Sequence, residues 1–293
     1  MKKVSKRAMM CKAVMMCMVF ASLSGCVSFE SPSVVLGEGK IERTEGDSNK
    51  VAICVGLTAV DSRYYNGWAG DCPGCDVDAK GMYNLFVKNG YTSTLMLNSA
   101  CTWDNVSNTI LSNARKLKSG DKIVIMMSGH GGQIKDQNGD EVDGQDETIC
   151  MWDGQVRDDD VLKMLKQFPD GLKIVMINDQ CHSEGNYKTA LRSFKQTVSL
   201  GYWGTQEGTV LIDKSGFNGR LIQFAGCREA SYSYGATDGG TWTQSLLTVI
   251  EKDNTLSWII LFNKAKLIMP SNQTPVYMEE GEVGCFRDEA VLK

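Results

Sequence analysis

The chain has 293 residues, 42% of them hydrophobic and 23% charged, and a formal net charge of −4. These values are typical of a soluble globular protein whose bulk is one domain with a sizeable core. The negative charge argues against a nucleic-acid partner, because binding to phosphates depends on Lys and Arg.

The first 25 residues resemble a secretory signal peptide. Basic residues precede an apolar run at 13–23, which is too short to span a membrane as a stable helix. The run ends in Leu-Ser-Gly-Cys, which resembles the bacterial lipobox and implies lipidation of Cys26. We expect an extracytoplasmic protein of the bacterial cell envelope, lipid-anchored to a membrane, with a transmembrane anchor as the alternative. Cleavage would remove five basic residues and no acidic ones, moving the net charge from −4 to −9.

A tether is predicted between the lipid and the domain. Residues 26–49 carry Ser, Gly, Glu, Pro and Asn with little periodicity, which indicates a flexible segment, so the domain is expected to begin at Lys50. Residues 51–57 are apolar and β-prone and predict the first central strand. After a loop, an amphipathic helix is expected whose buried face extends from Ala79 to Phe86.

Strands and helices alternate in the next part of the chain. We predict a strand at 91–97, a helix at 103–117, and strands at 123–127 and 174–177. The last two are unbroken apolar runs, which are typical of strands buried on both faces of a parallel sheet. The alternation favours an α/β fold with right-handed crossovers, a mostly parallel central sheet of about six strands, and helices on both faces.

The remaining elements have weaker signals. An acidic insertion occupies 136–147, and residues 186–220 carry Gly, Ser, Thr and basic side chains with no clear period. We predict a short strand or hairpin at 148–152, a helix from 158, a strand at 221–225, helices at 242–250 and 256–268, and an edge strand at 275–278.

Two reactive side chains follow the apolar strands at 123–127 and 174–177. They are His130 and Cys181, and because chemistry in parallel sheets collects at the carboxyl ends of strands, we expect them to meet as general base and nucleophile. Either residue alone is more often structural. The chain has two histidines, however, and the other, His182, adjoins Cys181. His182 is the less favoured base, because a residue next to the nucleophile on an extended segment points elsewhere.

The sequences Ser-Gly-His-Gly at 128–131 and Asp-Gln-Cys-His-Ser at 179–183 resemble the two signatures of the metacaspase branch of the caspase-like cysteine peptidases. Caspase-type chains place about 50 residues between histidine and cysteine, and here the separation is 51. The resemblance implies an endopeptidase that forms a thioester on Cys181, with a caspase-like three-layer fold. It also implies a peptidase domain at 50–293 with a large-subunit-like part at about 50–185, a linker at about 186–219 and a small-subunit-like part at about 220–280.

The resemblance further implies an acidic S1 pocket. Asp179 stands two residues before Cys181, so on an extended strand it faces the same side as the thiol. The segment 74–79 is similar to the metacaspase stretch whose aspartate, here Asp78, joins it, which implies cleavage after Arg or Lys. The alternative for Asp78 is a helix N-terminal acid that interacts with the helix dipole. The implied oxyanion donors are the backbone amides of Gly131 and Cys181.

Calcium is the metal that the resemblance implies, because single-domain metacaspases bind it through aspartates and a hard cation prefers carboxylate oxygens. The matching residues are Asp146, Asp158 and Asp159. The family's fourth ligand position, seven residues after the cysteine, is Lys188, which argues against calcium activation unless Asp140 or Asp143 compensates. A solvated acidic loop is the alternative, and the chemistry itself requires no cofactor.

Cys72 and Cys75 form the one tight pair among 11 cysteines. A local disulfide is favoured over half of a metal site or two turn thiols. Structural zinc is not expected, because no second cysteine pair or spare histidine completes four ligands.

Several properties of the whole protein stay open at this level. Basic residues at 186–220 are candidate sites of self-cleavage, or belong to an ordinary exposed loop. The alternatives to a peptidase that cuts after basic residues are a relative with another P1 preference and an inactive caspase-fold scaffold that binds partners.

Overall fold

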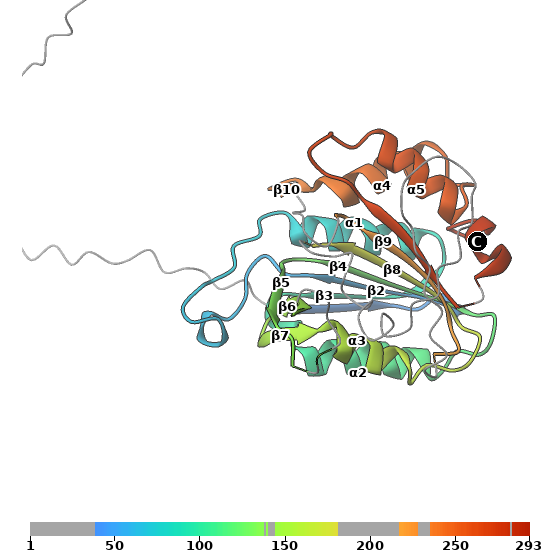
Figure 1. Ribbon diagram of the computed structural model, residues 1–293. Coiled ribbons are helices and arrows are strands. Elements are labelled where there is room, and N and C mark those ends of the chain that lie inside the picture. Colours follow the sequence, from blue (N-terminus) through green and yellow to red (C-terminus); the bar gives the residue numbers. More distant parts are fainter. Residues whose placement is uncertain (1–38, 138, 140–143, 181–216, 228–234, 282) are drawn as a thin grey trace, which may run out of the picture. The chain divides into compact units, whose positions relative to one another are not determined.

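The computed structural model describes residues 39–137, 139, 144–180, 217–227, 235–281 and 283–293. Their main feature is a seven-stranded sheet with the strand order β1-β3-β2-β4-β8-β9-β12 (Figure 1). The five inner strands are parallel, whereas the edge strands β1 and β12 run antiparallel to their neighbours, so the predicted mostly parallel sheet is confirmed. The strands are β1 Lys40–Thr44, β2 Asp47–Gly56, β3 Tyr91–Leu97, β4 Lys122–Ser128, β8 Lys173–Asp179, β9 Arg220–Ala225 and β12 Val276–Glu280.

Helices cover both faces of this sheet, because successive strand residues point to opposite sides. On β4, Val124 and Met126 belong to the hydrophobic cluster shared with α1, α4 and α5. Ile123 and Ile125 belong to the cluster on the other face, shared with α2 and α3 (Figure 1). The helices are α1 Cys75–Lys88, α2 Trp103–Ala114, α3 Asp158–Leu165, α4 Thr241–Lys252 and α5 Trp258–Leu267, with short 3-10 turns η1 Ser62–Tyr64, η2 Asn98–Ala100 and η4 Gly284–Asp288.

Strand β1 corrects the prediction of a flexible tether that extends to residue 49. It pairs with β3, and β2 already begins at Asp47, so regular structure starts before Lys50 and the sheet has seven strands rather than about six. The side chains of β1 are exposed or half-buried, so they carry no apolar pattern. Main-chain pairing with β3 defines this strand instead.

A second, three-stranded antiparallel sheet follows His130, where the sequence predicts only a short strand or hairpin at 148–152. It consists of β5 Gly131–Lys135, β6 Gln145–Met151 and β7 Gly154–Arg157. The N–H of Cys150 donates to the carbonyl oxygen of His130 at 2.9 Å, which ties the segment after β4 to this sheet. A small hairpin, β10 Gly235–Ala236 and β11 Gly239–Gly240, leads into α4 (Figure 1).

Several predicted features fall outside the described residues. Residues 1–38, with the predicted signal peptide and Cys26, are among them, and so is the 181–216 segment that contains Cys181 and His182. Within the ranges given above, no helix combines the length and apolarity that crossing a membrane requires.

Candidate active site

The carboxyl ends of β4 and β8 lie side by side, as their apolar runs predict. Ser128 at the end of β4 pairs with Asp179 at the end of β8, and the N–H of Gly129 donates to the carbonyl oxygen of Asp179 at 3.4 Å. His130 follows at once. Cys181 comes two residues after Asp179 but lies outside the described residues, so the predicted meeting of thiol and imidazole stays a prediction.

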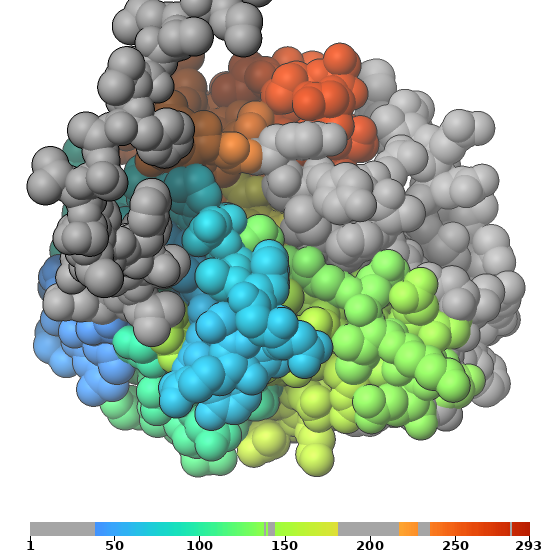
Figure 2. Space-filling view, turned by 90° about the vertical axis from the view of Figure 1, so that its left-hand side faces the viewer, coloured from blue at the N-terminus to red at the C-terminus, as the bar shows by residue number. Residues whose placement is uncertain are grey.

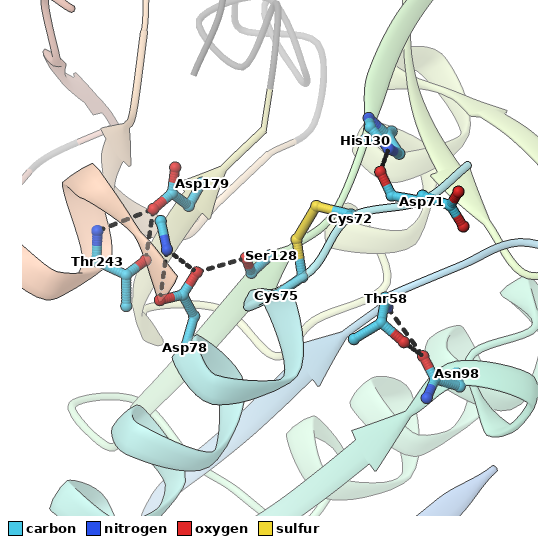
Figure 3. The surroundings of a disulfide bond; sticks show 11 residues. Thr58, Asp71, Cys72, Cys75, Asp78, Asn98, Ser128, His130, Asp179 and Thr243 are labelled. Carbon is cyan, nitrogen blue, oxygen red and sulfur yellow. Dashed lines mark hydrogen bonds between the residues drawn. A yellow bond between two sulfur atoms is a disulfide. The ribbon is translucent and has the colours of Figure 1, made fainter. Parts of the chain in front are cut away.

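The His130 ring is held by the loop between β2 and α1. Its Nε2 lies 3.2 Å from the carbonyl oxygen of Asp71 (Figure 3), and the Trp68 ring packs against it at a centroid distance of 4.9 Å. A carbonyl oxygen only accepts, so this contact places the hydrogen on Nε2 and leaves Nδ1 as the proton acceptor. The sequence has no local signal for the contact, because Asp71 and His130 are 59 residues apart.

Asp78 lies in the first turn of α1, fully buried, and its carboxylate faces α4. It accepts hydrogen bonds from Ser128 Oγ at 2.8 Å, from the N–H of Gly240 at 2.8 Å and from Gln244 Nε2 at 2.9 Å (Figure 3). These three donors come from β4, from the end of β11 and from α4. The helix-dipole alternative therefore does not describe what this carboxylate contacts.

Asp179 lies beside Asp78 and is held by the same end of α4. Its Oδ2 accepts hydrogen bonds from the N–H of Thr243 at 2.9 Å and from the hydroxyl of Thr243 at 2.8 Å (Figure 3). A Cβ on Gly240 would lie 2.2 Å from Asp179 Oδ2 and 2.8 Å from Asp78 Oδ2, so only glycine fits between the two carboxylates. The structure thus brings together the two aspartates predicted for S1.

The two carboxylates interact strongly because both are shielded from water. Burial, and after it the charge of Asp179, raises the pKa of Asp78 from 3.8 to about 7, while hydrogen bonds from Gln244, Gly240 and Ser128 lower it. At neutral pH the pair therefore holds a proton in part of the molecules. A bound cation would favour the fully ionised pair.

His130 and Asp179 line a cavity of about 200 Å³ at the carboxyl end of the sheet, and Asp78 lies behind this lining. In Figure 2 the loop before α1, coloured blue to cyan, occupies the middle of this face beside the green surface of β5–β7. Gly131, an implied oxyanion donor, begins β5 and pairs with Ile149. The cavity is lined by Asp71, Cys72, Pro73, Cys75, Ser128, Gly129, His130, Asp179, Gly235 and Gly240.

Cys72 and Cys75 form a disulfide, which confirms the local bridge. Figure 3 shows the bond between the His130 ring and the carboxylates of Asp78 and Asp179. Cys75 is also the first residue of α1, so the bridge closes the loop directly onto the helix that carries Asp78.

The residues predicted for calcium lie at two neighbouring elements. Asp146 on β6 and Asp158 at the start of α3 are buried, and Asp159 is half-buried. Burial, and then the charges of Glu147, Asp159 and Asp146, raise the pKa of Asp158 to about 8 against a hydrogen bond from the Asp159 amide that lowers it. In the described part of the chain, no three His, Cys, Asp or Glu side chains form a group that could hold a metal ion. The compensating residues Asp140 and Asp143, and the departure at Lys188, lie outside that part.

Sequence reasoning missed several residues that shape the site. They are Asp71, Ser128, Gly240, Thr243 and Gln244. Ser128 belongs to the Ser-Gly-His-Gly motif at 128–131, so the sequence carries a signal for this residue. The others have no local signal, because the contacts join segments far apart in the sequence.

Known proteins resemble this chain in both sequence and fold. A family model described as a caspase domain matches residues 52–284. Metacaspase-1 of Arabidopsis thaliana is 33% identical over 149 residues, covering 46% of this chain and 39% of the relative. Metacaspase-1 of Plasmodium falciparum is 27% identical over 261 residues, covering 79% of this chain and 40% of the relative.

A solved structure has a similar fold. The crystal structure of protein GSU0716 from Geobacter sulfurreducens has a TM-score of 0.69 and 28% sequence identity, covering 83% of this chain and 98% of that chain. The chain spans about two fifths of the length of the two metacaspases. Because the family model extends over most of the sequence, the chain belongs to the caspase-domain family of cysteine peptidases, and it is similar in sequence to metacaspases.

Proposed function

We propose that the protein is a cysteine endopeptidase that hydrolyses peptide bonds after Arg or Lys, with Cys181 as nucleophile and His130 as general base. The observation that carries this proposal is the pair of buried carboxylates, Asp78 and Asp179, next to the His130 cavity. Acidic pockets of this kind select cationic side chains, because a bound cation offsets the repulsion between the two acids.

The reaction begins with transfer of a proton from the Cys181 thiol to the His130 ring. A free thiol with a pKa of about 8.5 is mostly protonated at neutral pH, and Nδ1 of His130 is the acceptor because Asp71 holds Nε2. The Cys181 thiolate attacks the carbonyl carbon, and the backbone amides of Gly131 and Cys181 stabilise the oxyanion. As the C–N bond breaks, the leaving amine takes the proton from His130 and a thioester remains. Water, deprotonated by His130, then hydrolyses the thioester and the thiol is restored.

Recognition of P1 is coupled to the charge of the acid pair. Near neutral pH, Asp78 is close to its pKa of about 7. A guanidinium or ammonium group would favour ionisation of both aspartates and displace the shared proton. A neutral or acidic P1 side chain would leave the repulsion in place, so it would bind more weakly.

Calcium is proposed for the carboxylates of β6 and α3. The oxygen donors Asp146, Asp158 and Asp159 suit a hard cation. The pKa of Asp158 is raised to about 8 by burial first and then by the charges of Glu147, Asp159 and Asp146, which a cation would compensate. Asp140 or Asp143 would add further oxygen ligands. Bound calcium would offset the negative charge of these carboxylates, and the chemistry at Cys181 does not pass through it.

The rest of the proposal concerns location and processing. Lipid on Cys26 would anchor the domain to the membrane on its extracytoplasmic side, in the bacterial cell envelope. Basic residues at 186–220 would be self-cleavage sites for an enzyme that cuts after Arg or Lys. Mass spectrometry of the mature N-terminus and of the fragments formed by wild-type and Cys181→Ala protein tests both points.

Peptide reporters that differ only at P1 test the main proposal. We expect turnover of Arg and Lys reporters at least about 100-fold above Ala and Asp reporters, and none by Cys181→Ala. Asp78→Asn is expected to lower kcat/KM on basic reporters by about 100-fold and to leave the fold intact. Each assay is run with and without calcium. Equal turnover of neutral reporters would contradict the P1 assignment, and no turnover of any reporter would favour a binding role.

A further inference from the structure

The Cys72–Cys75 disulfide lies in the substrate cavity but has no part in the chemistry proposed above. It stands between the base and the acid pair (Figure 3). Both cysteines line the cavity, but Cys72 is half-buried whereas Cys75 is only 6% exposed. Of the two bridged residues, Cys72 is therefore the more accessible from the cavity.

The bond closes the segment that holds the imidazole. Asp71, the residue before Cys72, provides the only hydrogen bond to the His130 ring among the described residues. The backbone of Cys72 is tied to the preceding loop by its N–H, which donates to the carbonyl oxygen of Thr58 at 2.8 Å. The disulfide adds a covalent link from this peptide unit to α1.

Gly74, between the two cysteines, shows how tightly this segment is packed. Its φ of +93° belongs to the left-handed region that favours glycine. A Cβ at this position would lie 2.0 Å from the carbonyl oxygen of Ala236 and 2.7 Å from the nitrogen of Gly239. The segment 71–75 therefore contacts His130 through Asp71 and the β10–β11 hairpin at Gly74.

We propose that the Cys72–Cys75 disulfide is a thiol-reactive site whose reversible reduction controls the position of the His130 imidazole. The reactant is a thiol or dithiol, small or protein-borne, that enters the cavity. In the bridged form the Asp71 carbonyl holds Nε2, and Nδ1 is ready to accept a proton. In the reduced form the Asp71 peptide unit loses the disulfide cross-link and is joined to α1 through the backbone alone, so the imidazole is no longer held in one tautomer and orientation.

Reduction of the Cys72–Cys75 disulfide takes place in two successive thiol–disulfide exchange steps. A reductant thiolate attacks the Cys72 sulfur, the Cys72–Cys75 bond breaks, and its electron pair leaves with Cys75. That thiolate forms at the first residue of α1, where helix backbone amides stabilise negative charge. A second reductant thiol then attacks the mixed disulfide and releases the Cys72 thiolate. The reductant ends as a disulfide, and two electrons have passed to the cysteine pair.

Nuclear magnetic resonance of His130 tests the inference without any activity assay. The chain has two histidines, so a Cys181→Ala, His182→Gln variant carries His130 alone and lacks the candidate nucleophile. With ¹⁵N-labelled histidine, the bridged protein is expected to show the Nε2–H tautomer with a slowly exchanging ring hydrogen. After treatment with dithiothreitol, or with Cys72→Ser and Cys75→Ser added, we expect a tautomer mixture and faster exchange. The same tautomer and exchange rate in bridged and unbridged protein would overturn the inference.

Kinetics give a second readout, which rests on the proposed function. In oxygen-free buffer without thiol, the Cys72→Ser, Cys75→Ser protein is expected to lose about 10-fold in kcat on an Arg reporter relative to the bridged wild-type protein. KM should change less than about 3-fold, because the donors to Asp78 lie outside the 71–75 segment. Cys285→Ser, which removes an exposed free thiol on another segment, is the matched control and should change neither value.

The two readouts separate failure of the inference from failure of the proposed function. Wild-type protein that cleaves no reporter would end the proposed function, while the tautomer measurement would still decide the role of the bridge. An unchanged kcat in a folded, active Cys72→Ser, Cys75→Ser variant would refute the inferred role of the disulfide and leave the proposed function intact. Free thiols at Cys72 and Cys75 in protein isolated without reductant, detected by alkylation and mass spectrometry, would also refute it.

Discussion

At the scale of single residues, the carboxyl of Asp78 is expected to titrate near neutral pH. Its pKa of about 7 results from burial and from Asp179, opposed by donors that favour its ionised form. Gln244 is the first of these donors, and it reaches Asp78 from one turn into α4. The charge of the pocket near neutral pH therefore depends on a residue outside both sequence motifs.

Binding of a cationic probe is expected to follow that titration. Benzamidine, measured by calorimetry on the Cys181→Ala protein, should bind more weakly below about pH 7, because Asp78 takes up a proton there. Gln244→Leu removes a donor that favours the ionised carboxylate of Asp78. The pH midpoint of benzamidine binding should therefore rise by about one unit. Thr248→Val, on the exposed side of the same helix, is the control and should leave the curve unchanged. A midpoint that does not move would contradict this role of Gln244.

At the scale of elements, the N-terminus of α4 organises the pocket. It places the N–H of Gly240 on Asp78 and both donors of Thr243 on Asp179. Helix N-termini stabilise negative charge through unpaired amides and the helix dipole. One short stretch of backbone thus holds acids that come from α1 and β8.

Adding a methyl group at Gly240 should disturb this arrangement. A Cβ there would be 2.2 Å from Asp179 Oδ2, so Gly240→Ala must displace a carboxylate or the start of α4. We expect kcat/KM on an Arg reporter to fall at least about 10-fold, with circular dichroism close to wild type. In Gly81→Ala, the matched control on α1, the nearest atom at 2.8 Å is a terminal methyl of Leu247, which can move. That control should keep full activity, since alanine also favours the helix.

At the scale of the whole molecule, buried acids link stability to pH. The pKa values of Asp78 and Asp158 are raised from 3.8 to about 7 and about 8. The folded state therefore binds more protons than the unfolded state between about pH 4 and pH 8. Each group contributes stability when protonated that is lost as the pH rises through this window.

Urea unfolding without calcium should show that loss. The free energy of unfolding is expected to be lower at about pH 8 than at about pH 5.5 by about 1 to 3 kcal/mol. Asp158→Asn should flatten the profile only in part, because Asp158 no longer titrates while Asp78 still does. Calcium added at about pH 8 should raise the stability of the wild-type protein more than that of Asp158→Asn if this cluster binds it. Stability that rises with pH across the window would contradict the linkage.

The sequence by itself determined much of this protein. The α/β class, the positions of β3, β4, β8 and α1, the Cys72–Cys75 bridge and the neighbouring ends of β4 and β8 depend on local periodicity, on short spacings and on rules for parallel sheets. Asp78 and Asp179 were also identified, by resemblance to a family motif. The roles of Cys181 and of the calcium residues stay predictions.

Only the tertiary structure decided what holds these residues. Strand β1 exists through pairing with β3, the His130 ring depends on a carbonyl 59 residues away, and Asp78 is bound by an amide 162 residues away. These contacts are made by backbone groups or by ordinary polar side chains, which every segment has. Composition cannot show which of them meet, because that depends on how distant parts of the chain pack together.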